Sequence, residues 1–297
     1  MSDALLTPQL SEKLNTKLLE QNHKPGLYVV ATPIGNILDI SLRALGILKM
    51  AQCVFAEDTR QSRKLFDWYG IKTKLVACHE YNETDFSITS LINKQGIYAL
   101  ISDAGTPTVS DPGYKIVNWC LQNEIDVFPI PGASASIAAL SASGMPSDKF
   151  TFFGFLPSKN NARKTFLESL ENETGTLIFF ESPNRLLNTL EDMLEILGDR
   201  RCCVCRELTK IFEEFRRGNL LEMLRYFSNN KPTGEFVILI EGKITETKKE
   251  MEEVFSELNK LLKNTSLKES VNVLSEKYKI SRKIIYKKAL EIKNDFL

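Results

Sequence analysis

The sequence lacks several features that mark common classes of protein. It has only two histidines in 297 residues, and its net charge is zero because 38 lysines and arginines balance 38 aspartates and glutamates. A uniformly basic field for nucleic acid is therefore excluded, and such a partner has to be bound by a local patch. Its longest uncharged run, residues 127–147, is broken by prolines, glycines and serines. We therefore expect no membrane span.

Several ligand-binding motifs are also missing. The chain has no G-x-G-x-x-G, P-loop, H-E-x-x-H or EF-hand pattern. Because only His23 and His79 are available to complete a ligand set around the six cysteines, we expect no metal site. Residues 1–25 are polar, without the apolar core of a secretory signal. Reduced, mostly buried thiols in a cytoplasmic protein are the expectation.

Short apolar segments alternate with helical patterns from residue 26 onward. The first set of predicted strands is 26–32, 53–58, 74–80, 97–105 and 126–132. Helical patterns follow these strands, including one at 84–94, which predicts a parallel or mostly parallel sheet covered by helices. The second set is 150–157, 176–182, 202–208, 210–217 and 234–242. Since no helix separates 202–208 from 210–217, these two strands are expected to pair antiparallel.

The two sets of strands predict two α/β domains with a boundary near residue 140. We assign residues 26–140 to the first domain and residues 141–243 to the second. Residues 1–25 are expected to form a loose, flexible lead. Residues 244–297 are expected to form a helical, helix-turn-helix-like tail, whose many lysines and arginines indicate either a cationic binding face or a solvated helix face.

Glycine- and proline-rich segments follow four of the predicted strands, at 31–36, 102–113, 130–135 and 179–185. In open α/β sheets, ligands bind outside the carboxyl ends of the strands. Small residues there let backbone groups approach a ligand, and the helix that opens after Gly132 offers free N–H groups to a carboxylate. Each segment alone fits a tight turn. Three of them at the edge of one sheet predict a ligand cleft.

The same segments carry a resemblance to a known family. The matching sequences are GLYVVATPIGNILDISLRAL, AEDTRQSRKL, ISDAGTPTVSDPG, PIPGASA, FFGFLP, FFESPNR and TGEFVIL. With them the chain resembles the tetrapyrrole methylase superfamily and, within it, the ribosomal RNA small subunit methyltransferase I family. The resemblance covers about residues 25–242 and, more weakly, the tail.

The resemblance implies two α/β domains of the class III methyltransferase type, with S-adenosylmethionine in the cleft between them. The residues that it places at the cofactor are Pro33, Asp103, Ala104, Gly105, Thr106, Pro131, Gly132, Ala133, Ser134, Ser182, Gly234, Glu235 and Phe236. Many tetrapyrrole methylases have a longer glycine-rich loop than residues 32–36 of this chain. That departure favours the RNA-modifying branch over a tetrapyrrole substrate.

The reaction implied is methylation of the ribose 2′-hydroxyl of a cytidine in the decoding region of 16S rRNA. A base has to help remove the hydroxyl proton. Glu57, Asp58 and Glu181 are the candidates, and Arg60 is assigned to the catalytic set with them. The sequence does not choose among the three carboxylates, and a lone His79 is a weaker candidate.

Basic residues near these segments are assigned to RNA. They are Arg60, Arg63, Lys159, Arg163, Lys164, Arg185, Arg282, Lys283 and Lys287. Structural alternatives are a Glu57–Arg60 ion pair and an interdomain Glu181–Arg185 salt bridge. We expect a homodimer that acts on the small ribosomal subunit without a metal. The alternative functions are methylation of a tetrapyrrole, precorrin-like intermediate and a non-catalytic RNA-binding module.

Overall fold

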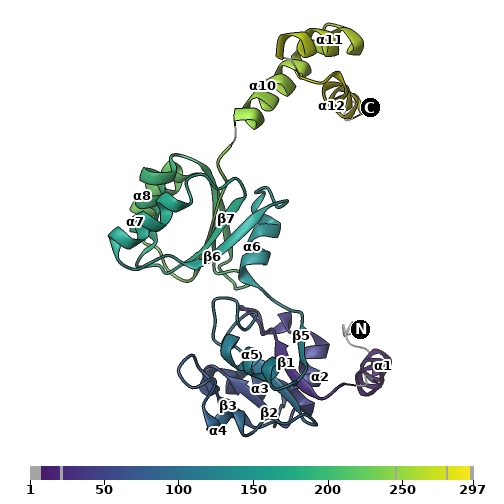
Figure 1. The fold of residues 1–297 in the computed structure, drawn as a ribbon, viewed down its shortest axis with the longest axis vertical. Helices are drawn as coiled ribbons and strands as arrows, with labels where there is room; N and C mark the ends of the chain where they lie inside the picture. Colours follow the sequence, from purple (N-terminus) through teal and green to yellow (C-terminus); the bar gives the residue numbers. More distant parts are fainter. Residues whose placement is uncertain (1–7, 21–22, 245, 279, 295–297) are drawn as a thin grey trace, which may run out of the picture. The chain divides into compact units, whose positions relative to one another are not determined.

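The computed structural model describes residues 8–20, 23–244, 246–278 and 280–294. The chain divides into two units (Figure 1). The larger unit comprises residues 1–171 and 175–241, and contains two five-stranded sheets. The smaller unit comprises residues 172–174 and 242–297, and contains the C-terminal helices. Two sheets and a helical extension confirm the predicted fold class.

The first sheet is parallel throughout, as the alternating pattern predicts. Its strands are β1 (Gly26–Val30), β2 (Cys53–Ala56), β3 (Leu75–Ala77), β4 (Ile97–Ile101) and β5 (Val127–Ile130), in the order β3-β2-β4-β1-β5. Successive strand residues point to opposite faces. Val54 packs into the core on one face, and Phe55 into the core on the other. The strands are therefore buried on both sides, as expected of a parallel sheet.

Helices and caps around this sheet follow local sequence signals. The helical segments are α1 (Pro8–Leu19), η1 (Ile37–Asp39), α2 (Leu42–Met50), α3 (Thr59–Tyr69), α4 (Phe86–Thr89) and α5 (Tyr114–Gln122). Ser41 caps α2, because its side chain accepts a hydrogen bond from the N–H of Ala44. Helix α3 ends at Gly70, whose φ of 61° is left-handed.

Two helical segments differ from the sequence predictions. Helix α1 occupies part of the predicted loose lead and contacts α2, whereas residues 1–7 and 21–22 lie outside the described residues. Helix α4 has four residues, although the pattern predicted a helix over 84–94. The buried carboxylate of Glu83 accepts hydrogen bonds from the N–H groups of Lys115 (2.9 Å) and Ile116 (3.3 Å). This anchor holds the start of the segment against α5.

The second sheet is mixed. Its strands are β6 (Phe150–Phe155), β7 (Thr176–Glu181), β8 (Arg201–Arg206), β9 (Glu214–Asn219) and β10 (Phe236–Ile240), in the order β6-β7-β10-β8-β9. Strands β8 and β9 pair antiparallel, as the missing helix between them predicts. Strand β9 begins later than the predicted residue 210. Residues 207–213 instead form the connecting turn, with Glu207 and Thr209 at positive φ.

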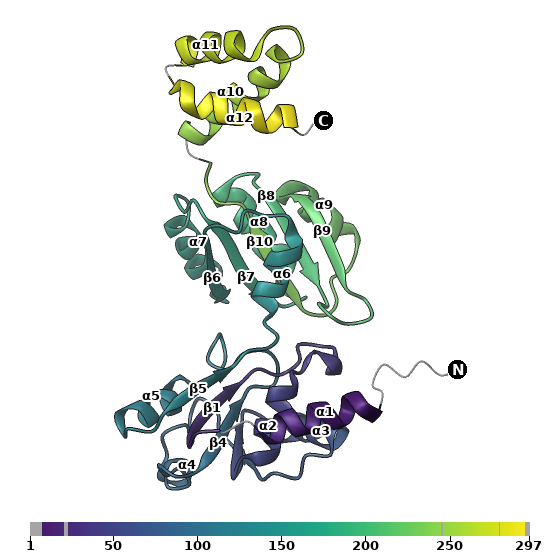
Figure 2. The ribbon, with the colours of Figure 1, turned by 90° about the vertical axis from the view of Figure 1, so that its right-hand side faces the viewer.

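Helices cover both faces of the second sheet (Figure 2). They are α6 (Ala135–Ser143) on one face, and α7 (Asn160–Ser169), α8 (Leu186–Leu197) and α9 (Leu220–Asn229) on the other. Helix α6 packs on β8 and β10, with Leu140 in the same core cluster as Val237. Residues 135–143 therefore belong with the second sheet, although the sequence analysis placed the boundary near residue 140.

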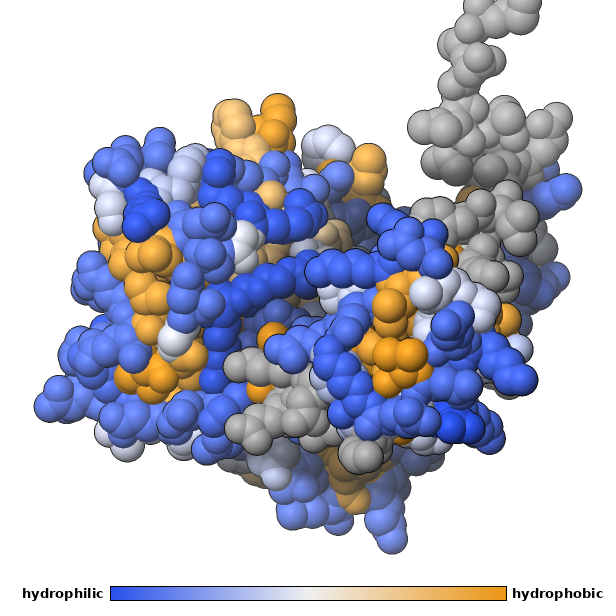
Figure 3. All heavy atoms as spheres, turned by 90° about the horizontal axis from the view of Figure 1, so that it is seen from above, coloured by the Kyte–Doolittle hydropathy of each residue, from blue (hydrophilic) through white to orange (hydrophobic). Residues whose placement is uncertain are grey.

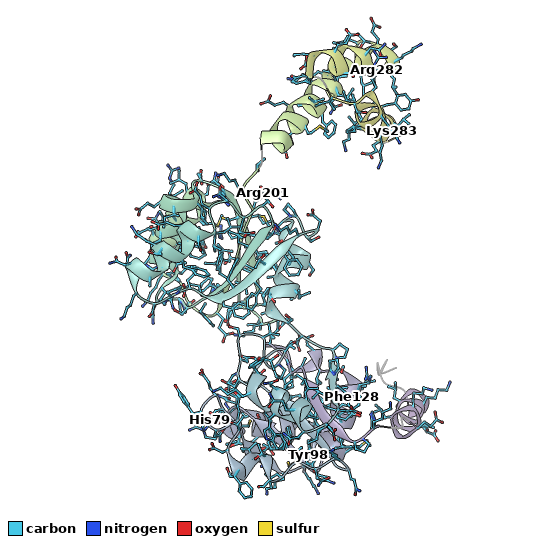
Figure 4. The ribbon with its side chains drawn as sticks, in the orientation of Figure 1. His79, Tyr98, Phe128, Arg201, Arg282 and Lys283 are labelled. Atoms are coloured by element: carbon cyan, nitrogen blue, oxygen red, sulfur yellow. The ribbon has the colours of Figure 1, made fainter. Side chains whose placement is uncertain are left out.

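Two arginines hold the C-terminal end of α6. Arg201 on β8, labelled in Figure 4, donates a hydrogen bond to the carbonyl of Gly144 (2.8 Å). Arg217 on β9 donates to the carbonyls of Ala142 (2.6 Å) and Ser143 (3.1 Å). The last carbonyls of a helix lack partners within the helix and carry partial negative charge. The two guanidinium groups supply hydrogen-bond donors to these carbonyls and positive charge beside them.

In its described residues, the C-terminal unit contains three helices with a core of their own. They are α10 (Glu246–Leu261), α11 (Leu267–Tyr278) and α12 (Arg282–Asn294). Their shared core is Val254, Leu258, Val271, Leu274, Ile285 and Ala289. Figure 3 shows hydrophilic residues over most of the visible face, with hydrophobic residues in separate groups. In the described residues, no helix combines the length and apolar character needed to cross a bilayer.

A buried ion pair joins α7 to α8. The Arg163 guanidinium donates to the Asp192 carboxylate at 2.6 Å, and their side chains are 5% and 6% exposed. The neighbouring Lys164 ammonium lies 2.6 Å from the Glu195 carboxylate, which is 64% exposed. Arg163 was assigned to RNA from sequence, but its burial leaves it inside the domain as a structural residue.

We expect Asp192→Ala to destabilise the protein by about 3–5 kcal/mol, because it leaves the Arg163 charge buried without a partner. Glu195→Ala on the same helix removes an exposed partner and should cost less than about 1 kcal/mol. Urea unfolding followed by circular dichroism measures both changes. Equal losses in the two variants would contradict this assignment of the buried pair.

Candidate functional site

Hydrogen bonds join the segments that follow β1, β4 and β5. The Thr32 N–H donates to the Gly105 carbonyl (2.8 Å), and the Gly105 N–H donates back to the Thr32 carbonyl (3.0 Å). The Thr106 hydroxyl donates to the carbonyl of Ala133 (3.2 Å). Gly105 has a φ of 81°, which favours glycine. Three of the four glycine- and proline-rich segments are thereby held at one edge of the first sheet.

A cavity of about 310 Å³ opens beside these segments. The predicted cofactor residues that line it are Ala104, Gly105, Thr106, Ser134, Ser182, Gly234, Glu235 and Phe236. Apolar walls come from both sheets and include Ile34, Val109, Phe180 and Leu208. A mostly apolar hollow with a few polar groups is the usual character of a small-molecule site.

The other predicted cofactor residues lie next to this cavity. Pro33 and Asp103 line a second cavity of about 320 Å³, which shares Ile34, Ala104 and Glu235 with the first. Pro131, Gly132 and Ala133 line neither cavity. A Cβ at Gly132 would lie 2.9 Å from the Ala31 Cβ, so this glycine permits close packing of the linking segment.

The N-terminus of α6 faces the first cavity through Ser134, Ala135 and Ser136. Ser134 is the N-cap residue, but its side chain makes no capping hydrogen bond. Its hydroxyl lies 3.1 Å from that of Ser136 instead. The first N–H groups of α6 are therefore available to an anionic group.

Asp58 and Arg60 form an ion pair at the start of α3. Asp58 caps the helix by accepting the N–H of Arg60 (2.8 Å), and its Oδ2 lies 2.8 Å from the guanidinium Nη2. These hydrogen bonds lower the pKa of Asp58 to about 2. The structure thus pairs Arg60 with Asp58, whereas the structural alternative drawn from the sequence paired it with Glu57. An Asp58 carboxylate of this kind is a weak base.

Glu57 has the opposite electrostatic environment. Burial raises its pKa first of all, and the negative charges of Asp111, Asp103 and Asp58 raise it further. The N–H of Asp103 lies 3.5 Å from its Oε2 and partly offsets these effects. A carboxylate with a raised pKa is a stronger proton acceptor than Asp58.

Asp111 lines the first cavity, although the sequence analysis did not select it. Burial raises its pKa, with a smaller opposing contribution from a hydrogen bond with Ser102. Its place in the SDPG sequence of a segment already chosen was the available signal. The described residues contain no group of three or more histidine, cysteine, aspartate or glutamate side chains able to hold a metal ion.

Glu181 lines the cavity, but its carboxylate is already engaged. It accepts hydrogen bonds from the Thr189 hydroxyl and the Ser182 N–H, both at 2.7 Å, and lies 3.3 Å from Nε of Arg185. Arg185 also donates to the carbonyl of Leu156 (2.6 Å). All these groups belong to the second sheet and its connections, so the pair is not an interdomain bridge.

The remaining predicted residues differ in their exposure. Arg60, Arg63 and Lys159 are exposed, and the Arg60 side chain is 89% exposed. The Lys164 ammonium is held by Glu195. His79 contacts the edge of Tyr81 and lines neither of the two cavities (Figure 4). Arg60, which is paired with Asp58, and Arg63 therefore place two exposed cationic groups on the first turns of α3.

Opposite pKa shifts at Glu57 and Asp58 predict opposite effects on stability. The pKa of Glu57 in the folded protein is raised above its ordinary value of 4.5. The contribution of this group to the free energy of unfolding is therefore present below that pH and is lost as the pH rises through the folded pKa. Glu57→Gln should therefore be more stable than wild type at neutral pH and equal to it in acid. The pKa of Asp58 is lowered from 3.8 to about 2. Asp58→Asn should therefore be less stable than wild type at neutral pH, and this difference should disappear as the pH falls through about 2.

Urea unfolding at neutral pH and at a pH below 4.5 measures the change at Glu57. The Asp58 variant serves as the matched control of opposite sign. A Glu57→Gln protein that is less stable than wild type at neutral pH would show that the carboxylate is favourably held.

Known proteins resemble this chain in sequence and in fold. The family model for Tetrapyrrole (Corrin/Porphyrin) Methylases matches residues 26–224. A Ribosomal RNA small subunit methyltransferase I from Halalkalibacterium halodurans is 48% identical over 226 residues, covering 75% of this chain and 78% of that protein. A protein of the same name from Pseudomonas aeruginosa is 43% identical over 272 residues, covering 89% and 96%.

Solved structures agree on the fold. A cobalt precorrin-4 methyltransferase of cobalamin biosynthesis matches with a TM-score of 0.55 and 17% identity, covering 72% of this chain and 94% of that chain. A uroporphyrin-III-C-methyltransferase from Thermus thermophilus matches with a TM-score of 0.50 and 19% identity, covering 72% and 93%. The chain belongs to the tetrapyrrole methylase family and, within it, to the proteins named ribosomal RNA small subunit methyltransferase I.

Proposed function

We propose that this protein transfers a methyl group from S-adenosylmethionine to the ribose 2′-hydroxyl of a cytidine in the decoding region of 16S rRNA. The observation that carries the proposal is the mostly apolar cavity with free helix N–H groups on one side and Asp111 on another. The relatives named for small-subunit rRNA support the substrate. We also propose that the protein acts in the cytoplasm as a homodimer and without a metal.

The residues of the cavity fit the chemistry of S-adenosylmethionine, which when bound supplies an electrophilic methyl group on a sulfonium. The apolar walls suit adenine, and the N–H groups at the start of α6 suit the carboxylate. The Asp111 carboxylate gives this cavity a negative field that suits a cation. Gly105 and Gly234, both at positive φ, let the backbone line the cavity without side chains.

The carboxylates differ in their fitness as the base. Asp58 caps α3 and pairs with Arg60, and Glu181 is engaged by Thr189 and Ser182. Burial raises the pKa of Glu57, Asp111 and Asp103, and negative charge nearby adds to each shift. Asp103 already accepts a hydrogen bond from the N–H of Asp58 at 3.1 Å, which leaves Glu57 and Asp111. A raised pKa favours acceptance of the hydroxyl proton near neutral pH. We therefore assign the base to Glu57 or Asp111.

Exposed cations on α3 suit the phosphates of RNA. Arg60 and Arg63 lie on the first turns of this helix, and Lys64 lines the second cavity. Arginine contacts phosphate through charge and paired hydrogen bonds, which positions the nucleotide without reading its base. We assign Arg60 to positioning of the substrate, together with Arg63 and Lys159.

The activity is tested with labelled S-adenosylmethionine and small ribosomal subunits that lack the native modification. The expected product after nucleoside digestion is 2′-O-methylcytidine. Binding of S-adenosylmethionine without transfer to subunits or naked rRNA would contradict the proposal. Transfer to a tetrapyrrole intermediate instead would identify the small-molecule branch of the family.

Single carboxamide variants separate the two base candidates. The variant that removes the base, either Glu57→Gln or Asp111→Asn, should lower kcat by about 10²–10⁴-fold. Glu57→Gln should leave binding of S-adenosylmethionine within a few fold, whereas Asp111→Asn removes a charge from the cavity and should also weaken that binding, as titration calorimetry measures. Glu195→Gln, on the far side of the second sheet, is the control and should retain kcat. A wild-type kcat in both carboxamide variants would contradict the assignment of the base to Glu57 or Asp111.

A further inference from the structure

The C-terminal unit carries a cavity of its own, of about 350 Å³, between α11 and α12. Its lining residues are Lys268, Val271 and Asn272 from α11, and Arg282, Lys283 and Tyr286 from α12. We call this the α11–α12 groove. Three of these six residues are cationic, none is acidic, and one is aromatic.

Helical spacing explains why these side chains meet. Lys268, Val271 and Asn272 are three and four residues apart, and so are Arg282, Lys283 and Tyr286. The buried side chain of Val271 connects the groove to the core of the unit. Arg282 and Lys283 lie on the first turn of α12, where the helix dipole adds positive potential (Figure 4).

Two lysines of this unit outside the groove are paired with carboxylates, unlike the two lysines of the groove. Lys277 lies 2.7 Å from the Glu257 carboxylate, and Lys288 lies 3.0 Å from that of Glu291. Arg282 is 3.9 Å from the Glu276 carboxylate, and both side chains are more than half exposed. Within residues 246–278 and 280–294, no ion pair involves Lys268 or Lys283. The groove therefore combines three cations, of which Lys268 and Lys283 have no carboxylate partner in this described part of the chain.

The composition of the groove selects one kind of partner. Unpaired lysines attract phosphates, the amide of Asn272 can pair with a base edge, and the ring of Tyr286 offers a surface on which a base can stack. Tyr286 is 48% exposed, so its ring is accessible. An amphipathic peptide would need a continuous apolar wall, and only Val271 and Tyr286 supply apolar surface here.

We propose that the α11–α12 groove is a second RNA-binding site, distinct in its residues from the methyl-transfer site. It holds the phosphates of an unpaired stretch of rRNA at Lys268, Arg282 and Lys283, with one base on Tyr286. The inference rests on the proposed function only in taking rRNA as the substrate. The groove supplies affinity for the substrate and takes no part in the chemical step.

The test uses the full-length protein with both lysines reversed in charge, Lys268→Glu with Lys283→Glu. Both positions lie on the first turns of their helices, where an acidic residue is compatible with the helix dipole, so the unit should stay folded. The matched control is Lys260→Glu, an exposed position on the last turn of α10 outside the groove. Circular dichroism and thermal unfolding check the fold of each protein.

Two measurements report on the groove. In methyl transfer to small subunits, the double variant should raise KM at least about tenfold while kcat is retained, a loss of about 1.4 kcal/mol in binding. In binding of a single-stranded rRNA fragment at several salt concentrations, the slope of log K against log salt should fall by about 0.7 for each lost phosphate contact. Tyr286→Ala should weaken binding, and Tyr286→Phe should restore it.

The outcomes separate this inference from the proposed function. The groove proposal would be overturned if the double variant kept the wild-type KM and salt slope, or if Lys260→Glu changed them equally. Either result would leave the methyltransferase proposal intact. Groove-dependent RNA binding by a wild-type protein that transfers no methyl group would support the groove and contradict the proposed function. Preference for anionic lipid vesicles over RNA, lost in the double variant, would overturn the choice of partner.

Discussion

The candidate site depends on the parallel pairing of β1 with both β4 and β5. This pairing brings the ends of three strands to one edge of the sheet, where hydrogen bonds join the segments that follow them. The Thr32–Gly105 bridge fixes two of them, and the Thr106–Ala133 hydrogen bond adds the third. The sheet thereby sets the position of Gly105 and Thr106, two of the residues that line the cavity.

Two adjacent acidic residues then acquire different chemistry because the chain changes direction between them. Glu57 still faces the other acids at the edge of the sheet, whereas Asp58 already caps a helix and meets Arg60. One pKa rises and the other falls. Proximity in sequence therefore says little about which carboxylate accepts a proton, since burial and local hydrogen bonds decide it.

Much of the architecture could be predicted from the sequence, because hydrophobic periodicity reports the strands and helices directly. The parallel sheet, the β8–β9 pair and the segments at the cavity follow from that pattern and from the positions of glycine and proline. The burial of Arg163 could not be predicted, since its partner Asp192 lies on another helix. Asp111 was missed for a similar reason, because only the folded loop brings it to the cavity. The hydrogen bond that Glu83, just before the short α4, accepts from the distant N–H of Lys115 could not be predicted either.

The position of helix α6 restricts the length of the segment that connects β5 to it. The helix packs on the second sheet, yet its N-terminus faces a cavity whose other wall belongs to the first. Only residues 131–134 connect β5 to α6, and Gly132 packs closely on Ala31. An inserted residue would rotate the start of α6 by about 100° and turn its free N–H groups away from the cavity. The crossing between the sheets is therefore expected to keep its length wherever the cavity is kept, while loops far from the cavity can lengthen or shorten.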